Sequence, residues 1–323
     1  MKRIGILTSG GDAPGMNAAI RAVVRAASYH GLEVYGIEHG YQGMMAGAIR
    51  PLGPRDVSGI INRGGTILHT ARSQDFMQPE GRAQAAAHLR QSGIEAIVVI
   101  GGDGSYRGAE ALQREFGIRC IGLPGTIDND IGGTDATIGF DTAINTAMEA
   151  IDRIRDTANS HDRIFFVEVM GRLNGYVAMM SGLAGGAEDI MLPEAGSSVE
   201  GLIERLRDGQ RRGKKSSIVV VAEGCQQGGA AALAKRVSER SEYSDNRVTV
   251  IGHLQRGGSP TAFDRVLASR MGVRAVEALR AGELGQMVAL AGRDLLLRPL
   301  SDSWTQRSRF DDELLHVSEV LSV

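Results

Sequence analysis

Two carboxylates stand two residues apart in the stretch Pro124-Gly-Thr-Ile-Asp-Asn-Asp130. The stretch follows Cys120-Ile-Gly-Leu123, a short apolar segment that predicts a buried parallel strand, because helices can cover both of its faces. Ligands of open α/β sheets bind at the carboxyl ends of strands. The spacing therefore favours Asp128 and Asp130 as a pair that holds a metal, accepts a proton, or divides these tasks. An Asx turn that caps the next helix is the alternative structural interpretation.

Two further apolar segments end in a Gly-Gly-Asp turn. Ser9-Gly-Gly-Asp-Ala-Pro-Gly-Met-Asn17 follows Ile4–Leu7, and Gly101-Gly-Asp-Gly-Ser105 follows Ile97–Ile100. Glycines let backbone N–H groups approach an anion that side chains would exclude, and a helix N-terminus adds a favourable dipole. Among these glycines, Asp103 requires a compensating cation such as Mg²⁺. Together with the two aspartates above, the turns predict a metal–nucleotide site.

Two other phosphate-binding motifs do not fit. Gly213-Lys-Lys-Ser216 resembles the end of a Walker loop, but Asp208 stands where that motif requires Gly, and the segment precedes its strand. Gly102-x-Gly104-x-x-x-Gly108 approaches a dinucleotide fingerprint. A nicotinamide dehydrogenase would have an acidic residue at the end of the next strand, where this chain has Leu123-Pro124. An aspartate beside the pyrophosphate would also be repulsive without a metal.

Charged side chains near the ends of other apolar segments favour a phosphorylated substrate. Guanidinium groups make planar bidentate bonds to phosphate, although for each arginine alone a solvated ion pair is the structural alternative. His253 and Glu223 are candidate sugar-phosphate ligands, with a structural histidine and an ion-paired glutamate as alternatives. The sequence has no His/Cys cluster at zinc spacing and no Gly-x-Ser-x-Gly motif. The arginines are Arg72, Arg163, Arg172, Arg247 and Arg256.

Length and composition limit the class of protein. A chain of 323 residues is long enough for two domains with large cores. A formal net charge of −2 gives no general attraction to nucleic acid or to anionic membranes. Cys120 and Cys225 are not at Cys-x-x-Cys spacing, so we expect reduced core residues. No signal peptide and no run of 18 apolar residues is recognised, which predicts a soluble, cytoplasmic protein.

Strand-length apolar segments alternate with amphipathic helical patterns along the chain, which predicts parallel sheets with right-handed crossovers. The helical pattern is clear around Ile20–Ala27 and Ile144–Ile154, and a boundary is expected near Gly139-Phe140, before a long helix that ends about Asn159-Ser160. The first four strands would form one unit and the next three a second unit. Residues 301–310 are polar, and residues 311–323 fit either a last strand or a last helix. The strand segments are Ile4–Leu7, Val34–Ile37, Ile97–Ile100, Ile121–Leu123, Ile164–Val169, Ile218–Ala222 and Val248–Ile251.

Six motifs, in order over residues 1 to about 280, resemble those of the bacterial ATP-dependent 6-phosphofructokinase family. They are Gly10-Gly-Asp-Ala-Pro-Gly-Met-Asn17, Ile61-Asn-Arg-Gly-Gly-Thr66, Gly101-Gly-Asp-Gly-Ser105, Pro124-Gly-Thr-Ile-Asp-Asn-Asp130, Val167-Glu-Val-Met-Gly-Arg172 and Gly252-His-Leu-Gln-Arg-Gly-Gly-Ser-Pro260. The resemblance implies Mg²⁺-dependent transfer of the γ-phosphoryl group of ATP to the 1-hydroxyl of fructose 6-phosphate. It also implies two Rossmann-like three-layer αβα domains with largely parallel sheets and an active site in the cleft between them. The ATP-binding domain would comprise residues 1–139 and about 255–305, and the fructose 6-phosphate domain residues 140–254 and about 306–323.

The resemblance also implies roles for single residues. Asp128 would be the base for the 1-hydroxyl, Thr126 would contact the transferred phosphoryl group, and Arg172 and Arg72 would neutralise its charge. Mg²⁺ would be held by Asp103, with Asp130 nearby. ATP would be bound by Gly11, Tyr41, Arg72, Gly102, Asp103, Gly104, Ser105 and Gly108. Fructose 6-phosphate would be bound by Thr126, Asp128, Met170, Gly171, Arg172, Glu223, His253 and Arg256, together with Arg163 and Arg247 from a neighbouring subunit of a homotetramer.

An effector site for ADP, as activator, and phosphoenolpyruvate, as inhibitor, is implied by the same resemblance. Taken alone, the basic run Arg211–Lys215 would be a solvated surface in most proteins. Glu188 matches a position associated with the metal of bound ADP, and Arg55 follows a loop that differs by one residue from relatives. The effector residues would be Arg21, Arg25, Arg55, Arg155, Glu188, Arg212, Lys214 and Lys215.

Two glycines concern the choice of phosphoryl donor. Pyrophosphate-using relatives carry Asp at the position of Gly104 and Lys at that of Gly125, so both glycines favour ATP. An NAD or lipid kinase also carries Gly-Gly-Asp-Gly turns, but it would not need the sugar-phosphate residues Arg172 and His253. A catalytically silent sensor is the alternative from another class, and the intact Asp103, Asp128 and Arg172 argue against it. Two segments of the tail, Ala289-Leu-Ala-Gly292 and residues 301–309, depart from the family pattern, and no matched site residue lies there.

Overall fold

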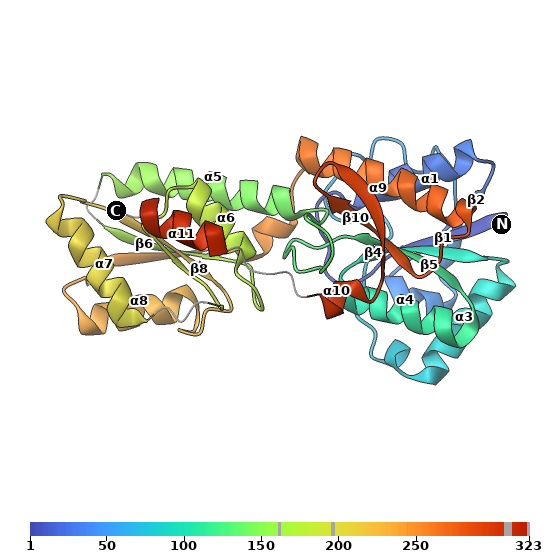
Figure 1. Ribbon diagram of the computed structural model, residues 1–323, viewed down its shortest axis with the longest axis horizontal. Helices are drawn as coiled ribbons and strands as arrows, with labels where there is room; N and C mark the ends of the chain where they lie inside the picture. Colours follow the sequence, from blue (N-terminus) through green and yellow to red (C-terminus); the bar gives the residue numbers. More distant parts are fainter. Residues whose placement is uncertain (161–162, 195–197, 244, 307–311, 322–323) are drawn as a thin grey trace. The chain divides into compact units, whose positions relative to one another are not determined.

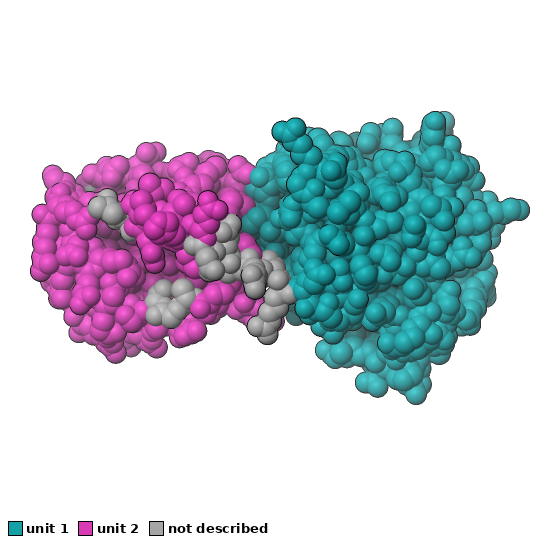
Figure 2. Space-filling model, in the orientation of Figure 1, with its two compact units in different colours: residues 1–142, 256–308 teal, residues 143–255, 309–323 magenta. Residues whose placement is uncertain are grey.

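The computed structural model describes residues 1–160, 163–194, 198–243, 245–306 and 312–321. The chain divides into two compact units (Figures 1 and 2), of which unit 1 holds residues 1–142 and 256–308 and unit 2 holds residues 143–255 and 309–323. Two of the passages between the units lie within described residues, after Thr142 and after Gln255.

The described part of unit 1 is built on a seven-stranded sheet in the order β11-β10-β5-β4-β1-β2-β3. The five inner strands are parallel to their neighbours, as predicted, whereas the edge strands β3 and β11 are antiparallel to theirs. Only residues 292–293 connect β10 to β11, which is too short for a parallel crossover. The strands are β1 (Arg3–Thr8), β2 (Glu33–Ile37), β3 (Ile49–Leu52), β4 (Ala96–Gly101), β5 (Arg119–Pro124), β10 (Gln286–Ala291) and β11 (Asp294–Pro299).

Helices cover both faces of this sheet and give unit 1 three layers (Figure 1). Helices α1 and α9 pack together on one face, and the apolar stripe of α1, Ile20–Ala27, is largely buried there. Helices α3 and α4 cover the other face, with Leu89 and Leu112 in its core. The helices are α1 (Met16–Tyr29), α2 (Gly40–Ala46), η1 (Asp75–Met77), α3 (Pro79–Gln91), α4 (Asp103–Phe116), α9 (Ala262–Ala281) and α10 (Asp302–Thr305).

The described part of unit 2 has a four-stranded sheet in the order β7-β8-β6-β9, and all of its neighbouring strands are parallel. Helices α7 and α8 cover one face, with Leu202 and Leu233 in the core, and α5 and α6 cover the other (Figure 1). The strands are β6 (Ile164–Val169), β7 (Asp189–Met191), β8 (Ser217–Ala222) and β9 (Asn246–Val250). The helical segments are α5 (Phe140–Ala158), α6 (Tyr176–Ala184), α7 (Val199–Arg211), α8 (Gly229–Arg240), η2 (Gly252–Arg256) and α11 (Asp312–Leu321).

The start of α5 is held by a buried carboxylate from α9. Asp264 is fully buried and accepts hydrogen bonds from the backbone N–H groups of Gly139 and Thr142, both at 2.9 Å. The hydroxyl of Thr142 donates a third bond at 2.5 Å. Burial raises the pKa of Asp264, and these hydrogen bonds oppose the rise. A residue from the C-terminal part of the chain thus satisfies the free N–H groups at the beginning of the predicted long helix.

Most sequence expectations for single elements are confirmed, and a few are wrong. Strands β3, β7, β10 and β11 were not predicted, and β9 begins and ends earlier than Val248–Ile251. Of the two alternatives for the last residues of the chain, a strand or a helix, the helix is observed as α11. Residues 307–311 and 322–323 lie outside the described part. Cys120 and Cys225 are buried and unpaired, as expected. Among the described helices, none has both the length and the apolar character needed to cross a membrane.

Candidate active site

Three loops meet at the carboxyl edge of the sheet in unit 1, because β1, β4 and β5 are neighbours and run in the same direction. The backbone N–H of Ser9 donates to the carbonyl of Ile100 at 2.9 Å, and that of Gly125 donates to the carbonyl of Gly101 at 3.1 Å. The hydroxyl of Ser105 donates to the carbonyl of Ser9 at 3.1 Å. The two Gly-Gly-Asp turns and the stretch with the paired aspartates are therefore brought together, as the sequence predicted.

The aspartate pair does not cap a helix. The next helix, α5, begins only at Phe140, so the alternative interpretation as a capping turn is not supported. Asn129 has a left-handed backbone with φ of 51°. The backbone N–H of Asp128 donates to the hydroxyl oxygen of Thr126 at 3.2 Å, and Thr137 donates to the Thr126 carbonyl at 2.7 Å. No helix starts directly after this hydrogen-bonded turn. Its two carboxylates therefore remain at the end of a strand, where ligands bind in this class of fold.

Negative charge accumulates around Asp130. Its side chain keeps access to solvent, but loss of hydration and the charges of Asp128 and Asp103 raise its pKa to about 6, with desolvation the largest cause. Among the described residues, no group of three or more His, Cys, Asp or Glu side chains is placed to hold a metal. One or two of these carboxylates can still bind Mg²⁺, which commonly completes its shell with water and substrate phosphates.

Asp103 is the first residue of α4, directly after β4 and Gly102. One carboxylate oxygen accepts a hydrogen bond from the backbone N–H of Gly104 at 2.6 Å, and the other lies 3.8 Å from Nε of Arg107. Half of the Asp103 side chain, 55%, is exposed. An exposed carboxylate at this helix start is accessible to a cation from solvent.

The glycines of the predicted nucleotide site differ in the space that surrounds them. A Cβ at Gly104 would meet no atom within 4 Å, so the space beside its backbone is open. A Cβ at Gly11 would lie 2.7 Å from Nη1 of Arg256, which donates to the carbonyl of Asp12 at 3.0 Å. Arg256 of the predicted sugar-phosphate set is thereby placed beside Gly11 of the predicted nucleotide set.

Tyr41 and Gly108 belong to the interior of unit 1. The ring of Tyr41 is buried and stacks on Phe76 at 4.0 Å between centroids, and its hydroxyl donates to the carbonyl of Ser105. A Cβ at Gly108 would lie 2.9 Å from Tyr41 and 3.0 Å from Phe76. Close packing of these two rings against α4 is thus sufficient to require glycine at position 108.

The loop that carries Arg72 lies against the first glycine turn. The hydroxyl of Thr70 donates to the carbonyl of Gly10 at 2.8 Å, and that of Thr8 donates to the carbonyl of His69 at 2.7 Å. These bonds fix the backbone two residues before Arg72, whose side chain is exposed. The sequence placed this arginine with the nucleotide residues, and the loop brings it next to them.

Unit 2 carries a second group of predicted residues at the carboxyl edge of its own sheet. Met170–Arg172 follow β6, Glu223 follows β8, and His253 follows β9, and both β8 and β9 pair with β6. The N–H of Glu223 donates to the carbonyl of Val169 at 2.9 Å. The N–H of Met170 donates to the side chain of Gln255 at 2.7 Å. Arg172, Glu223 and His253 are exposed.

Arg163 and Arg247 lie at the opposite edge of this sheet. Arg163 directly precedes β6, and Arg247 is the second residue of β9. Six residues of strand β6 separate Arg163 from Met170, which corresponds to about 20 Å at the usual rise per residue. Asp245 joins the two arginines, at 2.7 Å from Nε of Arg163 and 2.6 Å from Nη1 of Arg247. Within unit 2 they are therefore far from the predicted sugar-phosphate residues at the carboxyl edge of the sheet.

The predicted effector residues are partly assembled within each unit. Arg21 and Arg25 lie one turn apart on α1, with Arg25 exposed, and Arg55 is exposed in the turn after β3. In unit 2, Nη1 of Arg155 lies 3.4 Å from Glu188, which accepts a hydrogen bond from the Ile218 N–H at 2.6 Å. The basic residues Arg212, Lys214 and Lys215 follow α7 directly.

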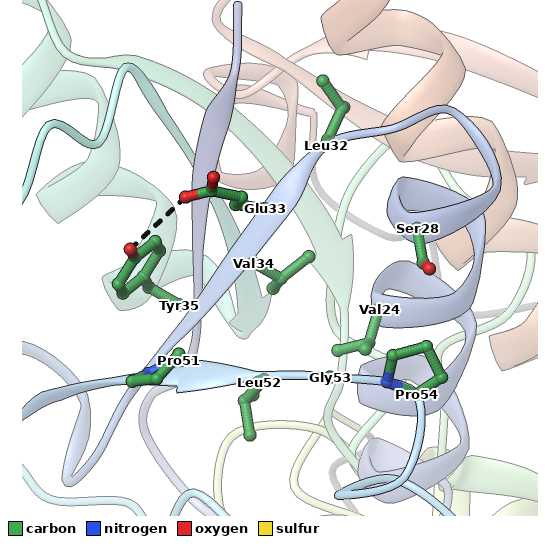
Figure 3. Close-up of a pocket in the computed structure, with 10 residues that line it drawn as sticks. All are labelled: Val24, Ser28, Leu32, Glu33, Val34, Tyr35, Pro51, Leu52, Gly53 and Pro54. Carbon is green, nitrogen blue, oxygen red and sulfur yellow. Dashed lines mark hydrogen bonds between the residues drawn. The ribbon is translucent and has the colours of Figure 1, made fainter.

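A pocket of about 300 Å³ lies away from all the predicted catalytic residues, where α1 meets β2 and β3 (Figure 3). None of the predicted site residues lines it, although Val24 and Pro54 are the chain neighbours of Arg25 and Arg55. Its lining is Val24, Ser28, Leu32, Glu33, Val34, Tyr35, Pro51, Leu52, Gly53 and Pro54.

The sequence profile of the phosphofructokinase family matches residues 3–279. The chain belongs to this family and is a phosphotransferase. It is 59% identical over 323 residues to ATP-dependent 6-phosphofructokinase 1 of Thermus thermophilus, and 54% identical over 323 residues to the ATP-dependent 6-phosphofructokinase of Bacillus thuringiensis. Both alignments cover the whole of each chain. These findings confirm the resemblance drawn from the six motifs.

Solved phosphofructokinases have the same fold. The Saccharomyces cerevisiae phosphofructokinase matches 99% of this chain with a TM-score of 0.89 and 35% identity, and the chain spans 50% of the yeast chain. A pyrophosphate-dependent phosphofructokinase from Marinobacter aquaeolei matches 100% of the chain and 92% of its own length, with a TM-score of 0.87 and 25% identity. Because a pyrophosphate-dependent enzyme has this fold, the fold alone does not identify the phosphoryl donor.

Two residues beside the predicted sites were missed. Arg107 lies next to Asp103, and its spacing of four residues in a helix was a usable signal. Asp245 joins Arg163 to Arg247, and its position two residues before Arg247 did not by itself indicate a bridge.

Proposed function

We propose that the chain is a cytoplasmic, Mg²⁺-dependent 6-phosphofructokinase that transfers the γ-phosphoryl group of ATP to the 1-hydroxyl of fructose 6-phosphate. The products would be ADP and fructose 1,6-bisphosphate, in the committed step of glycolysis. The observation that carries the proposal is the convergence of Asp103, Asp128 and two glycine turns at one sheet edge of a phosphofructokinase-family chain.

Asp128 is proposed to accept the proton of the 1-hydroxyl as the oxygen attacks phosphorus. Phosphoryl transfer requires in-line placement and neutralisation of charge, and little covalent participation by the protein. Thr126 would contact the transferred group, and Arg72 and Arg172 would supply positive charge. The hydrogen bond from the Asp128 N–H to the hydroxyl oxygen of Thr126 holds this side chain against the Asp128 backbone in one turn, which supports these paired roles.

Asp103 and Asp130 are proposed to hold Mg²⁺ together with the phosphates of the nucleotide. The raised pKa of Asp130 supports this proposal, because lost hydration, the largest cause, and the charges of Asp128 and Asp103 disfavour an ionised carboxylate that a bound cation would stabilise. When bound, the metal would neutralise charge on the phosphate oxygens. The open space at Gly104 and the close backbone contacts of Ser9, Gly101 and Ser105 support a phosphate cradle at the start of α4.

The phosphorylated sugar is proposed to bind to the exposed residues at the carboxyl edge of unit 2. His253 and Arg172 would bind oxygen atoms of the sugar phosphate, and Glu223 would accept hydrogen bonds from sugar hydroxyls. The hydrogen bonds that join the loops after β6 and β8 support a common site for these residues. Arg256, beside Gly11, would contribute from unit 1.

Arg163 and Arg247 are proposed to serve the sugar-phosphate site of a neighbouring subunit in a homotetramer. Their position at the far edge of the sheet, about 20 Å of strand away from Met170, supports a role outside their own chain's site. The active site would then be complete only in the assembled protein.

ADP and phosphoenolpyruvate are proposed as effectors that bind to the basic residues of α1 and of the segment after α7. Arg155 and Glu188 already form a connected pair in unit 2, which supports a preformed part of that site. Fructose 6-phosphate saturation curves with and without phosphoenolpyruvate test this proposal, and identical curves would contradict it.

A coupled assay that contains ATP, Mg²⁺ and fructose 6-phosphate tests the main proposal. We expect turnover with ATP and little or none when pyrophosphate replaces it. A higher kcat/KM with pyrophosphate would contradict ATP as the donor. Absence of fructose 1,6-bisphosphate with either donor would contradict the reaction itself.

A further inference from the structure

Arg107 lies between Asp103 and the single tryptophan of the chain. Its guanidinium carbon lies 4.5 Å from the centre of the Trp304 ring, and its Nε lies 3.8 Å from the Asp103 carboxylate. Both charged side chains are 55% exposed. A guanidinium over an indole ring is favourable because the face of the ring is electron-rich. The ring thus provides a fixed surface for a cation next to the proposed metal ligand.

Trp304 is itself held in place by the loop of the aspartate pair. Trp304 lies in α10, where it is half-buried against the core of unit 1. The backbone N–H of Gly132 donates to the carbonyl of Ser303 at 3.3 Å. A Cβ at Gly132 would lie only 1.8 Å from the carbonyl oxygen of Gln306. The segment that departs from the family pattern is therefore in close contact with the loop that follows Asp130.

The direction of the Arg107 side chain brings its charge to the start of α4. Side chains in a helix tilt toward the N-terminus, and Arg107 reaches back one turn to Asp103 in this way. The backbone at Gly104, in that first turn, borders open space. A phosphate placed there would meet the helix N-terminus and the guanidinium together.

We propose that Arg107, positioned by Trp304, is a further binding residue for the polyphosphate of the nucleotide. This inference rests on the proposed function, because the phosphate site at the start of α4 is part of it. The segment around Trp304 thereby contributes to the nucleotide site, although no residue there matches a site position of the family.

A purely structural role is the alternative that the experiment must separate. An exposed Asp–Arg pair four residues apart stabilises a helix only weakly. Such a pair would leave nucleotide affinity unchanged when it is removed. A direct contact to phosphate is stronger, because a hydrogen bond to a charged group contributes more than a neutral one, so its loss should weaken ATP binding about tenfold.

Tryptophan fluorescence can follow nucleotide binding without turnover. Since Trp304 is the only tryptophan, emission of the full-length protein reports on its surroundings alone. We expect titration with ATP and Mg²⁺, without fructose 6-phosphate, to change the emission in a saturable way. In Arg107→Gln the midpoint of the titration should rise about tenfold, or the change should vanish.

Steady-state kinetics provide the second measurement. Arg107→Gln should raise KM for ATP about tenfold and leave KM for fructose 6-phosphate unchanged, and Arg107→Lys should recover part of the loss. Trp304→Leu should raise KM for ATP in the same direction, whereas Trp304→Phe, which keeps an aromatic face, should remain nearer to the unmodified protein.

Arg90 offers a matched control on the same layer of unit 1. Its guanidinium carbon lies 6.0 Å from the ring of Phe116, at the other end of α4. Arg90→Gln removes a similar cation–ring pair far from Asp103 and should not change KM for ATP. If the unmodified protein is active and Arg107→Gln binds ATP with unchanged affinity, the inference is wrong. If the unmodified protein shows no kinase activity, the proposed function fails instead, and the fluorescence titration still decides whether Arg107 binds nucleotide.

Discussion

Asp245 accepts a hydrogen bond from Nε of Arg163 at 2.7 Å. Its other oxygen lies 2.6 Å from Nη1 of Arg247, so one carboxylate joins the two arginines proposed to serve a neighbouring subunit. The hydrogen bond from Arg163 and the charges of both arginines lower the pKa of Asp245, which therefore stays ionised at neutral pH. Each guanidinium has five N–H donors, so most donors of both remain available for phosphate.

Asp245→Asn should raise KM for fructose 6-phosphate about threefold to tenfold with little change in kcat, because the arginines would lose the group that orients them. Saturation curves with fructose 6-phosphate at fixed ATP measure this effect. Glu242→Gln is the matched control, since Glu242 is 54% exposed, similar to Asp245 at 55%, and pairs with Arg207 instead. An equal rise of KM in both variants would contradict a specific role of Asp245.

Asp128→Asn should lower kcat about 10²–10⁴-fold, because the variant keeps the shape of the side chain but cannot accept the proton. Nucleotide affinity, measured by the emission of Trp304, should change little. The Asp128 N–H bond to Thr126 comes from the backbone and is retained in the variant. Near-normal turnover would show that another group accepts the proton.

The loops of unit 1 could be predicted because their signals are local. An apolar segment followed by Gly-Gly-Asp, or by two nearby aspartates, identifies a strand and its loop within about a dozen residues. Parallel pairing of neighbouring strands then brings the loops together. The same reasoning located the loops after β6, β8 and β9. One edge of the sheet in unit 1, formed by β10 and β11, was not predicted. These two strands follow the last of the six family motifs in the sequence.

Contacts between distant residues could not be predicted in the same way. The ATP role of Gly108 stays a prediction, and the sequence did not indicate that a Cβ at this position would meet the rings of Tyr41 and Phe76. Nothing in the sequence near Trp304 indicates that Arg107 packs on its ring. A motif indicates which residue type stands in a given loop. Which neighbouring side chain makes that residue type necessary is decided by tertiary packing.

Gly104→Asp should raise KM for ATP at least about tenfold without loss of stability. Position 104 is open, and an acidic residue in the first turn of α4 is favourable for the helix, so the main effect is repulsion of the nucleotide phosphates. Kinetics with ATP and thermal unfolding measure the two effects. Unchanged KM for ATP would contradict the proposed position of the phosphates.

Gly125→Ala, in contrast, should lower the stability of the protein. Its Cβ would lie 2.9 Å from Cγ2 of Ile100 and 3.2 Å from Cε of Met16, both fully buried. Insertion of a methyl group into such packing costs about 1–3 kcal/mol. Urea unfolding should show this loss. A variant as stable as the unmodified protein would mean that Ile100 and Met16 move aside easily.

Asp130 should make stability depend on pH in a defined direction. Its folded-state pKa of about 6 lies above its usual value of 3.8, so the folded protein binds this proton more tightly than the unfolded chain does. The contribution of Asp130 to the free energy of unfolding should therefore decrease as pH rises from about 4 to about 6, and it should be constant at higher pH. Asp130→Asn cannot ionise, so its stability relative to the unmodified protein should increase over this interval and then level off. Urea unfolding at several pH values, without nucleotide or Mg²⁺, measures the difference. A difference that is constant from pH 4 to pH 7 would mean that neither Asp128 nor burial disfavours the ionised carboxylate.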